Sequence, residues 1–193
     1  MSTLTFMKEV VLANKSTGAL APSSKALAEV VTAMAQLDDA DVIVEYGPGT
    51  GVFTEVILRR MKREAYFLAM EVNPEFVKAT QKCCPRAVVR LDGAQNTAKY
   101  LKEAGYDHCD VIVSGLPWTR FEDALQDEIL DATYDVLRPG GRFVTFGYSF
   151  SSLFPSGRKF FKDKLRRKFS RVVRSKPIFQ NFPPSVVYIA DKD

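Results

Sequence analysis

Residues 42–53 read VIVEYGPGTGVF, in which a short apolar run meets an acidic residue and then three glycines spaced two residues apart. The β-branched residues of the run are typical of a buried strand. Glycines at this spacing allow unusual backbone conformations and let a nucleotide approach the chain closely. The stretch therefore predicts a strand, a nucleotide-binding loop and the start of a helix.

The same alternation of strand and helix patterns continues along most of the chain. We expect strands at 41–46, 65–72, 86–92, 110–118 and 142–148, and helices at 27–37, 52–63, from Pro74, at 97–104 and at 121–136. Five βα units in series predict a parallel sheet with right-handed crossovers. Two last strand-like stretches, 171–179 and 185–190, suggest an antiparallel pair at the sheet edge. The expected fold is α/β: a Rossmann-like, mostly parallel seven-stranded sheet with helices on both faces and the last strand antiparallel.

Composition favours one domain over residues 1–193, with a helical cap at 1–38 and the Rossmann-like core at 39–193. The chain is 46% hydrophobic and 26% charged, which is ordinary for a soluble globular protein. No apolar run approaches the roughly 20 residues that span a bilayer, and the first residues do not resemble a secretory signal. Three cysteines without CxxC spacing fit a cytoplasmic location, and the single His108 leaves no His-based metal site.

The net charge of +4 is unevenly distributed, because residues 157–176 hold ten basic residues against Asp163 alone. A basic helix at about 157–168 would meet something anionic. Three interpretations stay open: the helix lies on an anionic membrane, it contacts RNA phosphates, or its phenylalanines pack on the sheet and its cations are solvated. The membrane interpretation assigns contacts to Lys159, Phe160, Lys162, Lys164, Arg166 and Arg167.

The glycine loop itself narrows the choice of nucleotide. No lysine follows as in a phosphate-binding P-loop, and the third glycine of a dinucleotide fingerprint would fall at Val52. The pattern E-x-G-x-G-x-G, from Glu45 to Gly51, resembles that of S-adenosylmethionine-dependent methyltransferases. This cofactor has no phosphate, and it carries an ammonium group for which Glu45 supplies negative charge.

Two more strand ends agree with this resemblance. Glu71 lies 22 residues after Gly49 and could accept both ribose hydroxyls, and Asp92 could accept from the adenine amino group. The LRPGG turn at 137–141 also resembles this superfamily. The expected S-adenosylmethionine-binding residues are Glu45, Gly47, Gly49, Thr50, Gly51, Glu71, Val72, Asp92, Gly93, Ala94 and Ser114.

The motif SGLPW at 114–118 resembles the acceptor loop of amino-group methylases, with Ser114 in place of their usual polar amide. The resemblance suggests that a polar side chain and a carbonyl accept the protons of the amine while an aromatic ring packs against it. Trp118 could equally pack on the core. The expected catalytic residues are Ser114, Leu116 and Tyr148, and the expected substrate-binding residues are Tyr46, Leu116, Pro117 and Trp118.

Segments near both ends of the chain resemble bacterial phospholipid N-methyltransferases of the PmtA type, which act on phosphatidylethanolamine. They are the stretch 15–31, a preceding amphipathic pattern at Leu4, Met7, Val10 and Val11, and the tail KPIFQNFPPSVVYIA. The resemblance implies an enzyme that methylates a phospholipid amine on the inner face of the membrane, without a metal or protein partner. Ribosomal RNA adenine dimethyltransferases share many motifs, so an rRNA adenine N6-methyltransferase is the main alternative. A non-catalytic S-adenosylmethionine-binding adaptor is the second.

Overall fold

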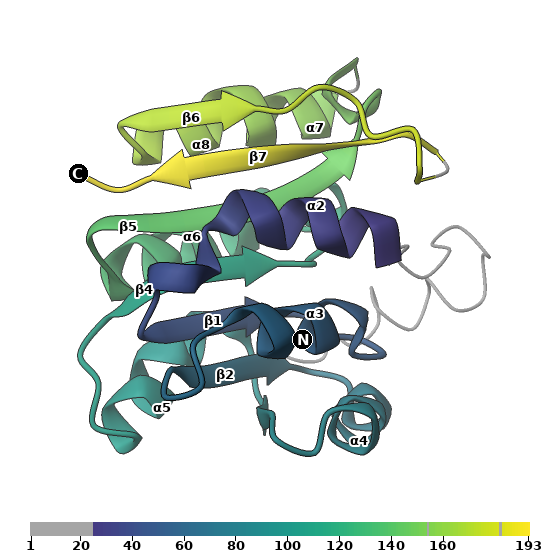
Figure 1. Ribbon diagram of the computed structural model, residues 1–193. Helices are drawn as coiled ribbons and strands as arrows, with labels where there is room; N and C mark the ends of the chain where they lie inside the picture. Colours follow the sequence, from purple (N-terminus) through teal and green to yellow (C-terminus); the bar gives the residue numbers. More distant parts are fainter. Residues whose placement is uncertain (1–24, 154, 182) are drawn as a thin grey trace.

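The computed structural model describes residues 25–153, 155–181 and 183–193, which contain a seven-stranded sheet in the order β3-β2-β1-β4-β5-β7-β6 (Figure 1). The strands are β1 (Val42–Tyr46), β2 (Tyr66–Glu71), β3 (Val88–Leu91), β4 (Cys109–Ser114), β5 (Leu137–Tyr148), β6 (Arg171–Arg174) and β7 (Ser185–Asp191). Strands β1 to β5 are parallel, whereas β7 runs antiparallel to both of its neighbours. The predicted α/β, Rossmann-like sheet is confirmed.

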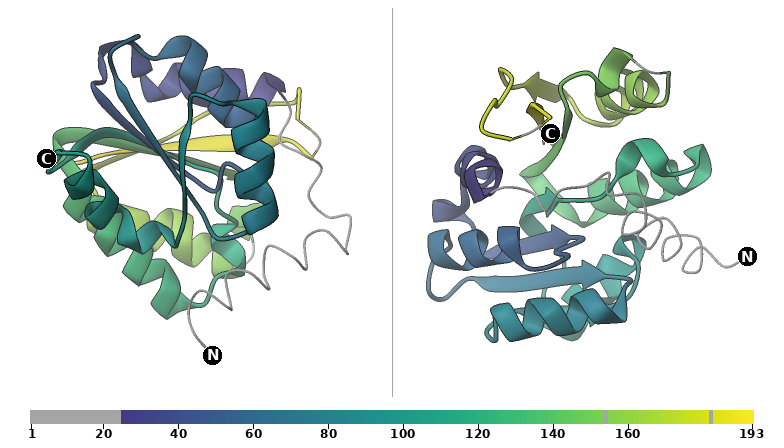
Figure 2. Two further views of the ribbon diagram at one scale, coloured as in Figure 1. Left: turned by 90° about the horizontal axis from the view of Figure 1, so that it is seen from below. Right: turned by 90° about the vertical axis from the view of Figure 1, so that its right-hand side faces the viewer.

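Helices cover both faces of this sheet, as the left view of Figure 2 shows. One face carries α2 (Lys25–Ala35), α3 (Val52–Arg60) and α4 (Pro74–Cys83). The other carries α5 (Thr97–Glu103), α6 (Asp123–Val136) and a C-terminal helical stretch of α7 (Pro155–Arg158), η5 (Lys159–Lys164) and α8 (Leu165–Lys168). Single turns lie between them, at η1 (Leu37–Asp39), η2 (Ala94–Asn96), η3 (Trp118–Arg120) and η4 (Ser151–Leu153).

The core consists of two layers because successive residues of a strand point to opposite faces. In β1, Ile43 packs with α2 and α3, whereas Val44 packs on the side of α5 and α6. In β4, Ile112 packs on the side of α5 and α6, whereas Val113 packs on the side of α2 and α3. Burial on both faces explains why these strands appear in the sequence as nearly continuous apolar runs.

Helix α4 begins where the sequence predicts it, and its start is well specified. The Asn73 side chain accepts a hydrogen bond from the Glu75 amide at 2.9 Å, and Pro74 occupies the first helical position. The helix ends at the adjacent cysteines Cys83 and Cys84. Its position matters because its C-terminal half contacts the glycine loop.

The C-terminal helical stretch spans residues 155–168, and its central part is a π-helix. The wider turn lets the consecutive residues Phe160 and Phe161 both face the sheet. Phe160 stacks on Trp118 with ring centroids 4.4 Å apart, and Phe161 stacks on Tyr188 at 4.3 Å. The expectation that Phe160 contacts a membrane is therefore wrong, since its side chain is fully buried.

Most of the predicted N-terminal cap, including Leu4, Met7, Val10 and Val11, lies outside the described residues. Its last part is the predicted amphipathic helix, present as α2. There, Leu27, Val31 and Ala35 are buried against the sheet.

Candidate cofactor and acceptor site

The predicted cofactor residues gather at the carboxyl ends of the parallel strands. Strands β1 and β4 are neighbours, and the chain builds outward from them in opposite directions, to β2 and β3 on one side and β5 on the other. Ligands of open α/β sheets bind at such a switch in strand order. The loops after β1 and β4 are joined across it by a hydrogen bond from the Gly115 amide to the Tyr46 carbonyl at 2.8 Å.

The glycine loop after β1 has left-handed backbone at all three glycines, with φ of 68° at Gly47, 58° at Gly49 and 88° at Gly51. A Cβ atom on Gly47 would lie 3.1 Å from the Leu116 side chain, and one on Gly51 would lie 3.3 Å from Cys83 Sγ. A Cβ on Gly49 would meet nothing within 4 Å. Gly49 is therefore the position at which the loop leaves room for a ligand.

The peptide groups of Gly49 are fixed from two sides. The Gly49 amide donates to Glu71 Oε2 at 3.2 Å, and the Gly49 carbonyl accepts from Thr80 Oγ1 on α4 at 2.9 Å. Thr80 is fully buried, and sequence reasoning missed it because an isolated threonine within a helix carries no signal of its own. Its hydroxyl makes α4 a support of the loop.

Glu71 is buried at the end of β2 and is held in place by backbone amides. Its Oε1 accepts from the amides of Val72 and Asn73, each at 2.9 Å. Burial raises the pKa of Glu71, although these bonds and that from Gly49 act in the opposite direction. A carboxylate offers about four acceptor positions, so the three amides leave one for a further donor.

Glu45 lies near the end of β1 with 1% of its surface exposed. Thr54 Oγ1 donates to its Oε2 at 2.6 Å. Burial and, to a smaller extent, the charge of Glu71 raise the pKa of Glu45 to about 8, although the hydrogen bond from Thr54 acts in the opposite direction. A buried carboxyl of this kind favours a nearby cation, which would stabilise its ionised form. The ammonium group of S-adenosylmethionine fits this requirement.

Asp92 closes the turn after β3. Its Oδ1 accepts from the Gly93 amide at 2.7 Å and from Asn96 Nδ2 at 2.8 Å, and its Oδ2 accepts from the Tyr100 hydroxyl at 2.9 Å. Partial burial raises the pKa of Asp92, but these hydrogen bonds outweigh it and hold the pKa below its ordinary value. Of the other predicted cofactor residues, Val72 and Ala94 are buried in the apolar layer below, and Thr50 is exposed.

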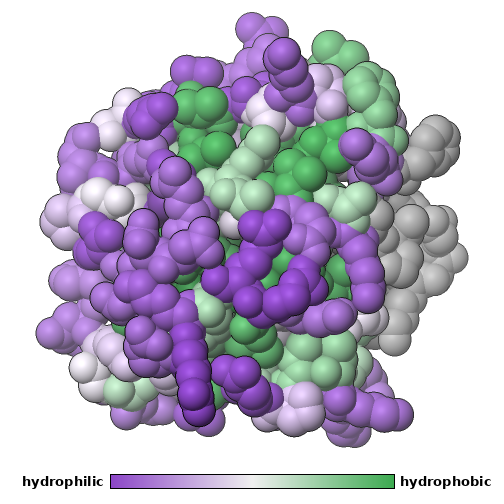
Figure 3. All heavy atoms as spheres, in the orientation of Figure 1, coloured by the Kyte–Doolittle hydropathy of each residue, from purple (hydrophilic) through white to green (hydrophobic). Residues whose placement is uncertain are grey.

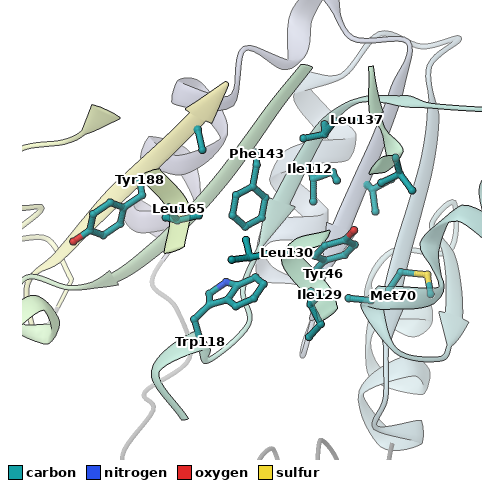
Figure 4. Close-up of a cluster of buried hydrophobic side chains, with 14 of the residues drawn as sticks. Tyr46, Met70, Ile112, Trp118, Ile129, Leu130, Leu137, Phe143, Leu165 and Tyr188 are labelled. Carbon is teal, nitrogen blue, oxygen red and sulfur yellow. The ribbon is translucent and has the colours of Figure 1, made fainter. Parts of the chain in front are cut away.

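The predicted substrate site differs from the structure at two aromatic residues, Trp118 in the loop after β4 and Tyr46 at the end of β1. Trp118 and Tyr46 were expected to bind substrate, yet 1% and 0% of their surfaces are exposed. Both lie in the buried cluster of Figure 4. Ser114 Oγ accepts from Trp118 Nε1 at 3.1 Å and from the Leu116 amide at 3.3 Å, so this hydroxyl fixes the loop.

Leu116, Pro117 and Tyr148 remain as half-buried residues that can line an acceptor site. The Leu116 carbonyl accepts from the Trp118 amide at 2.9 Å and retains one free acceptor position. Tyr148 ends β5 and stacks on Phe150 with centroids 5.5 Å apart. Burial raises the pKa of Tyr148 despite the nearby charge of Arg120, so the phenol stays neutral near neutral pH.

The basic segment is divided between two environments. Lys159, Lys164 and Lys168 form ion pairs with α6, whose partners are Asp123, Asp127 and Asp131. Lys164 is 3% exposed, so the expectation that it faces a membrane is also wrong. The other predicted membrane contacts, Lys162, Arg166 and Arg167, are exposed.

Comparison with known proteins shows the family to which this chain belongs. Residues 43–141 match a family model described as a methyltransferase domain. An ornithine lipid N-methyltransferase from Singulisphaera acidiphila is 33% identical over 128 residues, which are 64% of this chain and 66% of that relative. The chain thus spans slightly less than two thirds of the relative's length.

Solved structures share the fold at low sequence identity. An O-methyltransferase from Bacillus cereus in complex with S-adenosylhomocysteine has a TM-score of 0.70 at 14% identity, covering 97% of this chain and 91% of that one. The N-methyltransferase NodS from Bradyrhizobium japonicum, also with S-adenosylhomocysteine, has a TM-score of 0.62 at 14% identity, covering 86% and 87%. The chain therefore belongs to the methyltransferase domain family, and its fold is one in which these two neighbours hold the demethylated form of S-adenosylmethionine.

Proposed function

We propose that this protein transfers a methyl group from S-adenosylmethionine to the amine of a membrane lipid. The observation that carries the proposal is the 33% identity to an ornithine lipid N-methyltransferase, over a region that includes most of the family match. Phosphatidylethanolamine, the acceptor suggested by the sequence motifs, also presents an amine in its head group. The shared acceptor chemistry is a lipid-borne amine.

The described residues offer partners for three polar parts of the cofactor, namely the ribose, the adenine amino group and the ammonium group. Three of the four acceptor positions of Glu71 are taken by amides, so it can accept from one ribose hydroxyl and not from both, and Asp92 offers carboxylate oxygens at the adenine end. Glu45 is protonated below its pKa of about 8, and the ammonium group of the bound cofactor would stabilise its ionised form and so gain a negative partner. The space at Gly49 accommodates the close approach of the ligand to the backbone. When bound, the cofactor supplies a methyl group on a positively charged sulfur.

The acceptor amine must be neutral when it attacks. A nitrogen–carbon bond forms as the carbon–sulfur bond breaks, and one proton leaves the nitrogen. Tyr148 and the Leu116 carbonyl can accept hydrogen bonds from the amine and so orient its lone pair. Since the phenol of Tyr148 is neutral, it serves as an orienting group, and the proton of the ammonium form passes to water before attack.

The test uses the purified full chain with S-adenosylmethionine and vesicles that contain phosphatidylethanolamine or an ornithine lipid. Mass spectrometry of the extracted lipid should show one or more added methyl groups. The Glu71→Ala variant is the control, and it should lose most of this product because its cofactor site is impaired. A parallel reaction contains ribosomal RNA in place of vesicles, and methylated adenine there without lipid product in the vesicle reaction would favour the RNA alternative. Cofactor binding without any methylated product would favour an adaptor.

A further inference from the structure

Two loops beside the acceptor residues carry large apolar side chains that face solvent. Phe150 and Leu153 follow β5 and are 40% and 81% exposed, and Phe179, between β6 and β7, is 76% exposed. We call these three residues the apolar rim. Single exposed apolar residues are common on protein surfaces, so their significance depends on where they lie and what surrounds them.

The two loops are adjacent and lie at the cofactor end of the sheet. Arg174 Nη2 donates to the Ser149 carbonyl at 3.5 Å, and Ile178 pairs with Ser185 at the start of β7. Because β7 is antiparallel to β5, its first residue pairs with Tyr148, the last residue of β5. Figure 1 shows both loops on the right, where the arrows of β1, β4 and β5 point. Figure 3 shows hydrophobic atoms at the upper right of the same face.

The surroundings of the rim are positively charged. The sequence has no Asp or Glu between Asp135 and Asp163, or between Asp163 and Asp191. Both loops therefore lack carboxylates, while Arg158, Arg174 and Lys176 flank them as exposed cations. Apolar tips surrounded by Lys and Arg complement an anionic bilayer, which accepts apolar groups below its head groups and cations at its phosphates.

We infer that the apolar rim inserts into the surface of an anionic membrane, with Lys176 and Arg158 at the level of the lipid phosphates. This inference rests on the proposed function. Phe150 stacks on Tyr148, so a membrane that receives the rim brings its head groups to the acceptor residues. The surface differs from the basic helix singled out in the sequence, where Phe160 and Lys164 are buried and paired within the protein.

The experiment measures vesicle binding by the full chain without cofactor, so it does not depend on catalysis. Vesicles contain phosphatidylcholine alone or mixed with phosphatidylglycerol. The double variant Leu153→Glu, Phe179→Glu should bind the anionic vesicles about 100-fold less tightly, because each apolar side chain contributes roughly tenfold. Lys176→Glu should weaken binding to the anionic vesicles only. Leu91→Glu is the matched control, since Leu91 is 50% exposed on β3 at the opposite edge of the sheet.

Insertion depth provides a second readout that does not depend on affinity. The only tryptophan, Trp118, is buried, so a new indole reports its own surroundings. Leu153→Trp should be quenched by lipids brominated on their acyl chains, whereas Leu91→Trp should not. Unchanged binding of the double variant, or equal quenching at both positions, would overturn the inference that the apolar rim inserts into the membrane, even if lipid is methylated. Loss of binding in the double variant would support the rim even if no methyl transfer to lipid is found.

Discussion

At the scale of single residues, the cofactor loop is stabilised by a threonine that has no place in the familiar motif. Thr80 reaches from α4 to the Gly49 carbonyl, while Glu71 accepts from the Gly49 amide. The open space at Gly49 is therefore bounded by a backbone that cannot rotate without breaking one of these bonds. We infer that Thr80 positions the loop for S-adenosylmethionine.

Replacing Thr80 by Val should weaken S-adenosylhomocysteine binding about tenfold, because the nearly isosteric side chain leaves the Gly49 carbonyl without its partner. Thr80→Ser keeps the hydroxyl and should retain most of the affinity. Isothermal titration calorimetry on the three proteins checks this. A Val variant with native affinity would show that Thr80 only packs the helix.

Glu45 should make the stability of the protein depend on pH. Its pKa is raised from about 4.5 to about 8 by burial, so the folded chain holds a proton that the unfolded chain has released. This contribution to stability is complete below about pH 4.5, declines between about pH 4.5 and 8 at roughly 1.4 kcal/mol per pH unit, and is lost above about pH 8. Glu45→Gln should remove this slope from urea unfolding curves. Parallel pH profiles for the two proteins would contradict the assignment.

At the scale of elements, the contact between α6 and the C-terminal helical stretch is a ladder of ion pairs. Asp123, Asp127 and Asp131 are spaced four apart on one side of α6 and meet lysines of the other helix. In the middle ion pair the two partners differ in burial, because Lys164 is buried while the Asp127 side chain is 56% exposed. The Lys164 ammonium also donates to the Asp123 carbonyl at 2.8 Å.

This difference in burial predicts which of the two substitutions lowers the free energy of unfolding more. Asp127→Asn leaves the buried Lys164 ammonium with Asp123 as its one remaining carboxylate partner and should lower the free energy of unfolding by about 1–2 kcal/mol. Lys164→Met keeps the apolar stem and frees the aspartates to water, so it should cost less. Urea denaturation of both variants decides the order. The reverse order would mean that Coulomb attraction outweighs the desolvation of Lys164.

Contacts between residues far apart in the sequence are the part of this structure that the sequence did not predict. The strand and helix periods located each βα unit, and the carboxylates at the ends of β2 and β3 lie where the resemblance implied. The local pattern around Phe160 and Lys164 was compatible with a membrane face, with RNA contact and with packing. Their partners, Trp118 and Asp127, lie more than 30 residues away, so no local signal could select among these interpretations. Thr80 and Gly49, which are hydrogen bonded, are likewise more than 30 residues apart in the sequence.

At the scale of the whole molecule, the two ends of the sheet serve different purposes. The carboxyl ends hold the candidate cofactor and acceptor residues and the apolar rim. At the amino ends, Asp110 joins strands, since its Oδ2 accepts from the amides of Asp41 and Val42 at 2.8 Å each and its Oδ1 pairs with Arg138. The position of β7 between β5 and β6 was not predicted, because strand order within a final hairpin depends on tertiary packing.

This division predicts that stability and cofactor affinity can be changed separately. Asp110→Asn should lower the free energy of unfolding by about 1 kcal/mol, because the amide side chain keeps one acceptor oxygen and turns its NH2 group toward either the two backbone amides or Arg138. Binding of S-adenosylhomocysteine should be unchanged in the same protein. Denaturation and calorimetry on one preparation provide both numbers. A parallel loss of affinity would show that the two ends are coupled.

A competition between lipid and RNA in a single tube shows whether the methyl acceptor is a lipid amine. The full chain is given S-adenosylmethionine with a labelled methyl group, together with ribosomal RNA and vesicles of phosphatidylethanolamine, ornithine lipid and phosphatidylglycerol. Lipid and RNA are then separated and counted. We expect label in the lipid fraction, reduced when the amine-bearing lipids are omitted. Label confined to RNA would show that the acceptor is not a lipid amine.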